Sequence, residues 1–224
     1  MTTLPQPRAV LWDMDGVLVD SAAYHFEAWR TALAELEGFH VSYEQFKQTF
    51  GQRNDTILRA LFGPDYPDQS IARVGERKEQ LYRALVRERG IQPLPGVRRW
   101  LERLRAGGWR QAVASAAPRA NVEAILDALD LRPFFAAYTG AEDVTRGKPD
   151  PQVYLVAAAR LGVVPSRAIV IEDAPAGLEG ARRAGMKCIG VCSSHGDLVA
   201  DVVVASLEAL PDDALDQLVP PEVR

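Results

Sequence analysis

The sequence predicts an α/β protein whose parallel sheet carries an inserted block of helices. From Val97 onward, helical and strand patterns alternate at short spacings, which is typical of a parallel sheet with helices on both faces. Between about residues 20 and 92, four amphipathic helical patterns instead follow one another without a convincing strand. We therefore expect a core domain formed by residues 1–19 and 93–224, and a helical cap domain formed by residues 20–92.

The first strand is predicted at residues 9–12, an apolar run that ends in front of closely spaced carboxylates. Because side chains alternate along a strand, Asp13 and Asp15 leave its carboxyl end on the same side. One can act as a nucleophile while the other transfers a proton. Gly16 allows a tight turn that brings peptide groups close to whatever the acids hold. The alternative is an exposed acidic turn after the strand.

Four amphipathic helices are predicted next, because apolar residues recur at spacings of three and four. Ser21, Ser42 and Asn54 are suited to cap the first three, and Ser42 begins a capping-box sequence. A glycine follows each helix and is expected to end it. The predicted helices span residues 22–37, 43–50, 55–62 and 70–89.

Helices and strands then alternate toward the end of the chain. Leu215 and Leu218 form a short apolar pattern that we expect to pack on the edge of the core. The remaining strands are predicted at residues 111–114, 135–139, 168–171, 188–191 and 202–204, and the helices at residues 97–105, 122–129, 151–161 and 175–184.

Polar residues follow several of these strands. Ligands of parallel sheets bind outside the carboxyl ends of the strands. Asp13, Ser115 and Asp173 each follow a predicted strand, so segments far apart in the sequence should converge there. Ser115 could instead cap a helix, Lys148 could be a solvated loop lysine, and the Glu172-Asp173 pair could cap the next helix. The order of these residues favours one shared site over three coincidences.

The run Asp13-x-Asp15-Gly16-Val17-x-x-Asp20-Ser21 resembles the first signature of the haloacid dehalogenase (HAD) superfamily. Ser115, Lys148 and Glu172-Asp173 match its later signatures in the same order. The resemblance implies a Rossmann-like parallel-sheet core, the HAD fold, with a helical C1 cap inserted after the first strand. It also implies magnesium-dependent phosphoryl transfer.

Phosphoryl transfer needs a nucleophile, a proton donor for the leaving oxygen, and positive charge on the nonbridging oxygens. We predict that Asp13 attacks phosphorus to form an aspartyl phosphate and that Asp15 acts as general acid and base. Ser115 would donate a hydrogen bond to the phosphoryl group. Lys148 would neutralise that group and keep Asp13 ionised.

The acidic residues also predict a metal site. Asp13, Glu172 and Asp173 cannot all stay ionised at close range, because like charges raise one another's pKa. A hard cation resolves this, and oxygen ligands favour Mg²⁺. We predict that the carboxylates of Asp13 and Asp173 and the main-chain carbonyl of Asp15 hold Mg²⁺, with Glu172 bound directly or through water.

The chain is also similar to the β-phosphoglucomutase-like subfamily, through the run Tyr24-His25-Phe26-x-Ala28-Trp29 and through Arg77-Lys78. By that resemblance, His25 would assist the two aspartates as the cap closes, and Lys78 would reach from the cap toward the substrate. His25 could instead be a helix-surface or hinge histidine. The substrate-binding residues implied in this way are His25, Gly51, Arg53, Lys78 and Ala116.

Two departures from the sugar phosphomutases of that subfamily bear on the reaction. Those enzymes have an arginine where this chain has Asn54, and a Ser-Lys-Asn run after the second-signature serine, where this chain has Ala116-Ala117-Pro118-Arg119. A mutase needs these groups to hold a second phosphate. Arg53 or Arg119 could compensate for their absence.

The sequence thus predicts a Mg²⁺-dependent phosphatase that hydrolyses a small phosphorylated metabolite, in the first place a sugar phosphate, through an aspartyl-phosphate intermediate. The alternative enzyme is a β-phosphoglucomutase, in which a second sugar phosphate accepts the phosphoryl group. A non-catalytic phosphometabolite-binding protein would be expected to lack Asp13, Asp15, Lys148 or Asp173, and all four are present.

Net charge and hydropathy bear on which partners the protein binds and where in the cell it is found. The formal net charge of the 224 residues is −4 and the basic residues are mixed with acids, so we expect no nucleic-acid partner. No apolar run is long enough to span a bilayer, and residues 1–8 lack a signal-peptide pattern, which predicts a cytoplasmic protein without a membrane partner. Cys188 and Cys192 lie too far apart along a strand for a disulfide. We expect a monomer or weak homodimer.

Overall fold

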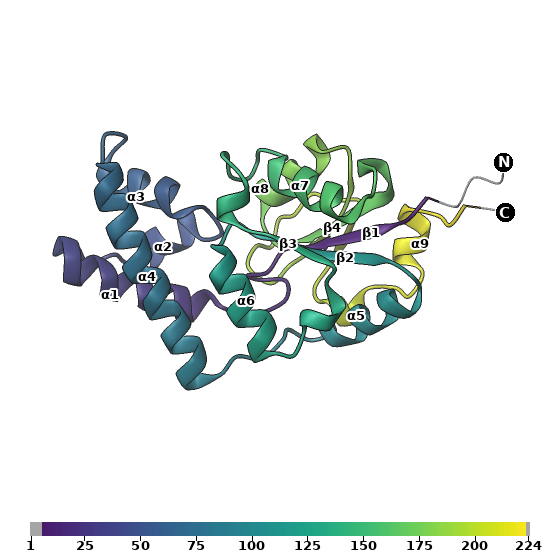
Figure 1. The fold of residues 1–224 in the computed structure, drawn as a ribbon, viewed down its shortest axis with the longest axis horizontal. Coiled ribbons are helices and arrows are strands. Elements are labelled where there is room, and N and C mark those ends of the chain that lie inside the picture. The colour runs from purple at the N-terminus through teal and green to yellow at the C-terminus, as the bar shows by residue number, and fades with distance from the viewer. Residues whose placement is uncertain (1–5, 223–224) are drawn as a thin grey trace.

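The computed structural model describes residues 6–222 and is built around a sheet of six parallel strands (Figure 1). The strand order β3-β2-β1-β4-β5-β6 places β1 between β2 and β4. Every pair in the sheet is parallel, which confirms the predicted α/β class with a Rossmann-like core. The strands are β1 Ala9–Trp12, β2 Arg110–Ala114, β3 Ala137–Thr139, β4 Ala168–Glu172, β5 Lys187–Val191 and β6 Val202–Val204.

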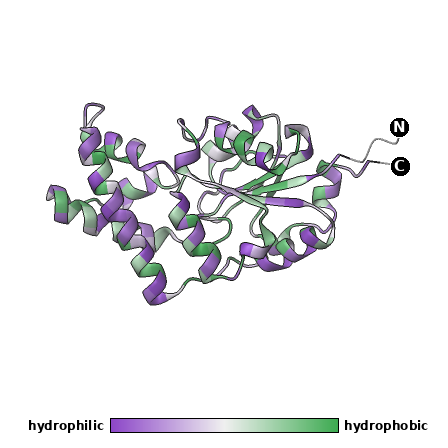
Figure 2. Cartoon of the chain, in the orientation of Figure 1, coloured by the Kyte–Doolittle hydropathy of each residue, from purple (hydrophilic) through white to green (hydrophobic). Residues whose placement is uncertain are grey.

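Strand β1 is buried along its whole length and sends alternate side chains to opposite faces of the sheet. Val10 and Trp12 join one hydrophobic cluster with α5, α6 and α9, whereas Ala9 and Leu11 join another with α7 and α8. Figure 2 shows hydrophobic residues along the strands at the centre of the molecule and on the helices around them. The helices are α5 Val97–Ala106, α6 Arg119–Ala128, α7 Gln152–Leu161, α8 Pro175–Arg183 and α9 Ala214–Leu218.

Helices α1 to α4, here called the helical block, gather at one end of the sheet (Figure 1). They enclose a hydrophobic cluster of their own that includes Trp29, Leu33, Phe46, Leu58 and Val74. The block therefore packs largely on itself, while Ala28 of α1 and Tyr82 and Val86 of α4 join the hydrophobic cluster of the core. The helices are α1 Ala22–Glu37, α2 Tyr43–Thr49, α3 Asn54–Phe62 and α4 Asp68–Arg89.

The chain leaves the core and returns to it at one place. Val19 and Pro93 form an isolated antiparallel bridge, and the Leu94 amide donates to the Leu18 carbonyl at 2.9 Å. The two connections to the helical block therefore lie side by side. The domain boundaries predicted at residues 20 and 92 stay a prediction.

Local details differ from expectation where a side chain finds a distant partner. Ser42 forms the predicted capping box. Ser21 and Asn54 do not cap their helices: Ser21 donates to Asp15, and Asn54 donates to Glu79. The apolar piece at 135–139 gives only the three-residue β3. Short 3-10 helices lie at Arg132–Phe134, Ala141–Asp143, Pro165–Arg167 and Leu207–Ala209.

Within residues 6–222, no helix combines the length and the apolar character needed to cross a membrane. Cys188 is buried and Cys192 is half-buried, and both are free thiols, as predicted.

Candidate active site

The carboxyl ends of β1, β2 and β4 bring the predicted residues together. Asp13 follows β1, Ser115 follows β2, and Glu172 ends β4. The Asp13 amide donates to the Ile171 carbonyl at 3.0 Å, so the backbone beyond β1 stays beside the end of β4. Since β1 is the middle strand of the three, its acidic end faces both neighbours.

Three carboxylates form a compact buried cluster at this edge. Oxygen atoms of Asp13, Glu172 and Asp173 all lie within 4.8 Å of one another, and the residues are 6%, 1% and 3% exposed. Burial raises the pKa of Asp13 well above its usual range, although the ammonium group of Lys148 opposes this. Burial and the charge of Glu172 raise the pKa of Asp173 to about 7. A divalent cation among these oxygens would offset both effects, so the donor set fits one.

Two glycines leave room for the cluster. A Cβ atom on Gly16, whose φ is +88°, would lie 2.0 Å from Oδ2 of Asp173. A Cβ atom on Gly177 would lie 1.9 Å from Oε1 of Glu172. Any side chain at either position would therefore displace a carboxylate. The sequence predicted a tight turn at Gly16 but not its closeness to Asp173, and Gly177 has the sequence context of an ordinary helix residue.

Lys148 lies inside the cluster and is not a solvated loop residue. Its Nζ atom is 2.5 Å from Oδ1 of Asp13 and 2.5 Å from Oε1 of Glu172. Burial favours the neutral amine, but the two carboxylates outweigh it and raise the pKa of Lys148 well above its usual range. The lysine is therefore charged at neutral pH and compensates part of the acidic charge.

Every acceptor position of Glu172 is in use. Oε1 accepts from Lys148 and, at 3.1 Å, from the Tyr154 hydroxyl. Oε2 accepts from the amides of Asp173 and Ala174, both at 2.8 Å. A carboxylate offers about four lone-pair positions. Tyr154 was missed by sequence reasoning, because only the packing of α7 on this face of the sheet brings it here.

Asp15 begins a chain of contacts into the helical block. Its Oδ1 atom accepts from Ser21 and lies 3.1 Å from Nε2 of His25. Burial would raise its pKa, but His25 and Ser21 prevail and lower it. His25 is buried, so it is not a helix-surface residue; its ring stacks on Tyr82 at 4.0 Å. The Nδ1 atom of His25 lies 2.8 Å from Nζ of Lys78.

Lys78 continues this chain to Glu79, which the sequence did not single out. Nζ of Lys78 is 2.9 Å from Oε1 of Glu79. The same oxygen accepts from Asn54 at 2.8 Å, and Oε2 accepts from Asn121 at 2.5 Å. No sequence motif marks Glu79 or Asn121. Adjacent charged residues on a helix, such as Lys78 and Glu79, are ordinarily solvated.

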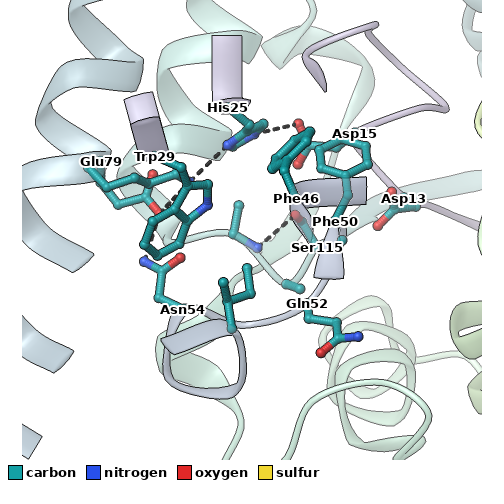
Figure 3. A pocket seen from close by; sticks show the side chains of 15 residues that line it. Asp13, Asp15, His25, Trp29, Phe46, Phe50, Gln52, Asn54, Glu79 and Ser115 are labelled. Carbon is teal, nitrogen blue, oxygen red and sulfur yellow. Dashed lines mark hydrogen bonds and ion pairs between the residues drawn. The ribbon is translucent and has the colours of Figure 1, made fainter. Parts of the chain in front are cut away.

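A pocket of about 40 Å³ is lined by Asp13 and Asp15 and by side chains of the helical block (Figure 3). Ser115 lies on the core side, where its Oγ accepts from the Ala117 amide at 3.0 Å. Trp29 and Phe46 form part of the opposite, apolar side. A cavity of this size holds a few water molecules and no sugar phosphate.

The predicted substrate-binding residues are not all at this pocket. His25, Gly51, Lys78 and Ala116 line it. Arg53 instead lines a neighbouring open groove of about 440 Å³. Its guanidinium group donates to the carbonyls of Ala141 and Val144, at 2.7 and 3.1 Å, and pairs with Asp55. Arg119 is likewise engaged, with Asp143.

The fold and the site together define a class: a Rossmann-like α/β hydrolase with a buried acidic cluster beneath a block of helices. The chain belongs to the haloacid dehalogenase-like hydrolases, whose family model matches residues 7–185. This confirms the resemblance drawn from the four signatures.

The relatives of this chain include both a phosphatase and a phosphomutase of sugar phosphates. The chain is 34% identical over 195 residues to the phosphorylated carbohydrates phosphatase of Thermotoga maritima, covering 85% of this chain and 88% of that protein. It is 32% identical over 216 residues to the β-phosphoglucomutase of Bacillus subtilis, covering 94% of each. A variant of CbbY from Rhodobacter sphaeroides, solved with xylulose-(1,5)bisphosphate, has a TM-score of 0.84 and 26% identity, covering 92% of this chain and 96% of that chain.

Proposed function

We propose that this protein is a Mg²⁺-dependent phosphatase that hydrolyses a small sugar phosphate through an aspartyl-phosphate intermediate. The observation that carries the proposal is the position of Asp13, which belongs to the acidic cluster and lies 2.5 Å from the ammonium group of Lys148, with Asp15 two residues away. The likeness to the Thermotoga maritima phosphatase supports it.

In the first step, a carboxylate oxygen of Asp13 attacks phosphorus and the bond from phosphorus to the leaving alcohol breaks. The ammonium group of Lys148 opposes the rise in the pKa of Asp13 that burial causes, and so favours the ionised nucleophile. The pair of Asp15 and His25 delivers one proton to the leaving oxygen. Ser115 donates to a phosphoryl oxygen.

In the second step, water attacks the phosphorus of the aspartyl phosphate, the bond from phosphorus to the Asp13 oxygen breaks, and inorganic phosphate and the free Asp13 carboxylate result. Asp15 accepts the proton of that water, which restores the protonated pair with His25. The contacts that lower the pKa of Asp15 suit this base role.

The cation is assigned to Mg²⁺, with the carboxylates of Asp13 and Asp173 and the main-chain carbonyl of Asp15 as ligands. Glu172 would act through water, because its four acceptor positions are already filled. When bound, Mg²⁺ supplies positive charge to the nonbridging phosphoryl oxygens.

The helical block acts as a cap that admits the substrate and then covers it. The pocket is too small for a sugar phosphate, so α1 to α4 must move away from the core for binding. The substrate contacts assigned to the cap are His25, Gly51 and Lys78. Ala116 would form part of the core side, and Arg53 would contact only a substrate that extends into the groove.

β-Phosphoglucomutase activity is the alternative that the Bacillus subtilis relative brings. Such an enzyme must hold a second phosphate and keep water from the aspartyl phosphate. Asn54 donates to Glu79, and Arg53 is engaged with the carbonyls of Ala141 and Val144. These contacts favour the phosphatase.

Phosphate release, measured with Mg²⁺ across a panel of sugar phosphates, tests the proposal beside a coupled assay for conversion of β-glucose 1-phosphate to glucose 6-phosphate. Release without isomerisation is expected. Isomerisation primed by a sugar bisphosphate, with little release, would instead identify a mutase.

A further inference from the structure

We propose that Glu79 makes the enclosed pocket selective for phosphate esters whose leaving group carries no second anionic group. This inference rests on the proposed phosphatase function and specifies which charge the leaving group of its substrate can carry. Glu79 is then a residue that determines specificity.

Glu79 lies across the pocket from the predicted nucleophile. Figure 3 shows Glu79 and Asn54 on one side and Asp13 on the other. Both acids line the same cavity, and Glu79 is only 5% exposed. When the helical block closes again over a bound substrate, a leaving group that starts at Asp13 and extends toward α4 therefore meets Glu79 at the far side of the pocket.

The carboxylate of Glu79 is held in place from three elements. Asn54 of α3, Lys78 of α4 and Asn121 of α6 all donate to it. Asn121 is fully buried and is itself fixed by Arg83, which donates to its carbonyl oxygen at 2.8 Å. A carboxylate fixed in this way cannot turn aside for an anionic ligand.

The positive charge on this side of the pocket is that of Lys78, and it is already paired. Lys78 has the one ammonium or guanidinium group among the described residues that line the pocket, and it is shared between Glu79 and His25. Arg53 is engaged outside the pocket. A second phosphate would lie against the Glu79 carboxylate in a water-poor space, where like charges repel strongly.

A neutral sugar meets no such repulsion. Three donors occupy Glu79, so one of its about four acceptor positions stays open to a hydroxyl group. The rings of Trp29 and Phe50 line the rest of this side and suit the apolar faces of a sugar.

Matched substrates test the inference. We would measure kcat/KM for fructose 1-phosphate against fructose 1,6-bisphosphate, and for glucose 1-phosphate against glucose 1,6-bisphosphate. Inhibition of p-nitrophenyl phosphate hydrolysis by the same compounds gives a second readout. The wild-type protein should favour each monophosphate at least about 100-fold.

The variant Glu79→Gln should reduce this preference at least about tenfold, since it removes the charge and keeps the shape. Glu76→Gln is the matched control: it removes an exposed glutamate three residues earlier on α4 and should leave the preference unchanged. If Glu79→Gln does not fold, Asn54→Arg adds a cation beside an intact Glu79 and should shift the preference in the same direction.

The outcomes separate the two proposals. If no monophosphate is hydrolysed, the phosphatase proposal fails and the inference fails with it. If monophosphates are hydrolysed but bisphosphates react or inhibit equally well, the inference alone is overturned. The same holds if Glu79→Gln and Asn54→Arg both keep the wild-type preference.

Discussion

The two sides of the active-site pocket differ in how completely their charges are matched. On the core side, Asp13, Glu172 and Asp173 share a single ammonium group, that of Lys148. On the side of the helical block, one lysine meets one glutamate, and two asparagines complete the network of Glu79. The core side thus needs a cation, whereas the other side is already satisfied. Under the two proposals made above, reaction chemistry and substrate choice lie on opposite sides of one small cavity.

The largest effect on activity is expected from replacing Asp13, the predicted nucleophile on the core side of the pocket. Asp13→Asn should lower phosphate release about 10⁴-fold or more, because the amide cannot form an acyl phosphate. Asp20→Asn, an exposed position in the same signature, is the control and should stay within a few-fold of wild type. Substantial turnover by Asp13→Asn would contradict the proposed mechanism.

On the side of the helical block, the matched charges of Lys78 and Glu79 should stabilise the folded protein. Lys78→Met leaves Glu79 without its cation and should lower the free energy of unfolding by about 3 kcal/mol, measured by chemical denaturation. Arg77→Met removes an exposed ion pair with Glu35 and should cost less than about 1 kcal/mol. Equal losses in the two variants would mean that the buried network is no more important than a surface pair.

A steric change can disturb the core side without touching its charges. Gly177→Ala places a methyl group where Oε1 of Glu172 lies and should lower the free energy of unfolding by about 2 kcal/mol. Gly196→Ala is the comparison, since a Cβ atom there meets nothing within 4 Å. A neutral Gly177→Ala variant would show that Glu172 can move freely.

The smallest effect concerns protons that compete with the cation. Because Asp173 has a pKa raised to about 7, it takes up a proton as the pH falls through 7, and Mg²⁺ must displace that proton. The dissociation constant for Mg²⁺, measured by calorimetry, should rise toward tenfold per pH unit below 7, about 1.4 kcal/mol. A constant affinity between pH 8 and pH 5.5 would exclude Asp173 as a ligand.

The sequence predicted the core side of the site better than the other side. Asp13, Ser115 and Glu172 end strands of a parallel sheet, and such ends always meet at one edge. Glu79 and Asn121 lie on helices from different parts of the chain. Their contact depends on how α4 rotates and packs against α6, which no local pattern records.

Local rules also failed where a tertiary partner competes. Ser21 and Asn54 are residue types that commonly cap helices, yet their side chains donate hydrogen bonds to Asp15 and Glu79. An isolated helix would favour the cap, because the amide is the only partner within reach. A buried carboxylate is a stronger acceptor, so the folded chain uses these residues in the site.

The bridge between Val19 and Pro93 has a consequence for how the chain can be cut. Because the two connections to the helical block lie side by side, a short turn from one to the other would delete all four helices and leave the strand order of the sheet unchanged. The core would lose the packing of Tyr82 and Val86 from α4. The two neighbouring connections thus mark the one place where a different insertion could replace these four helices without reordering the described strands.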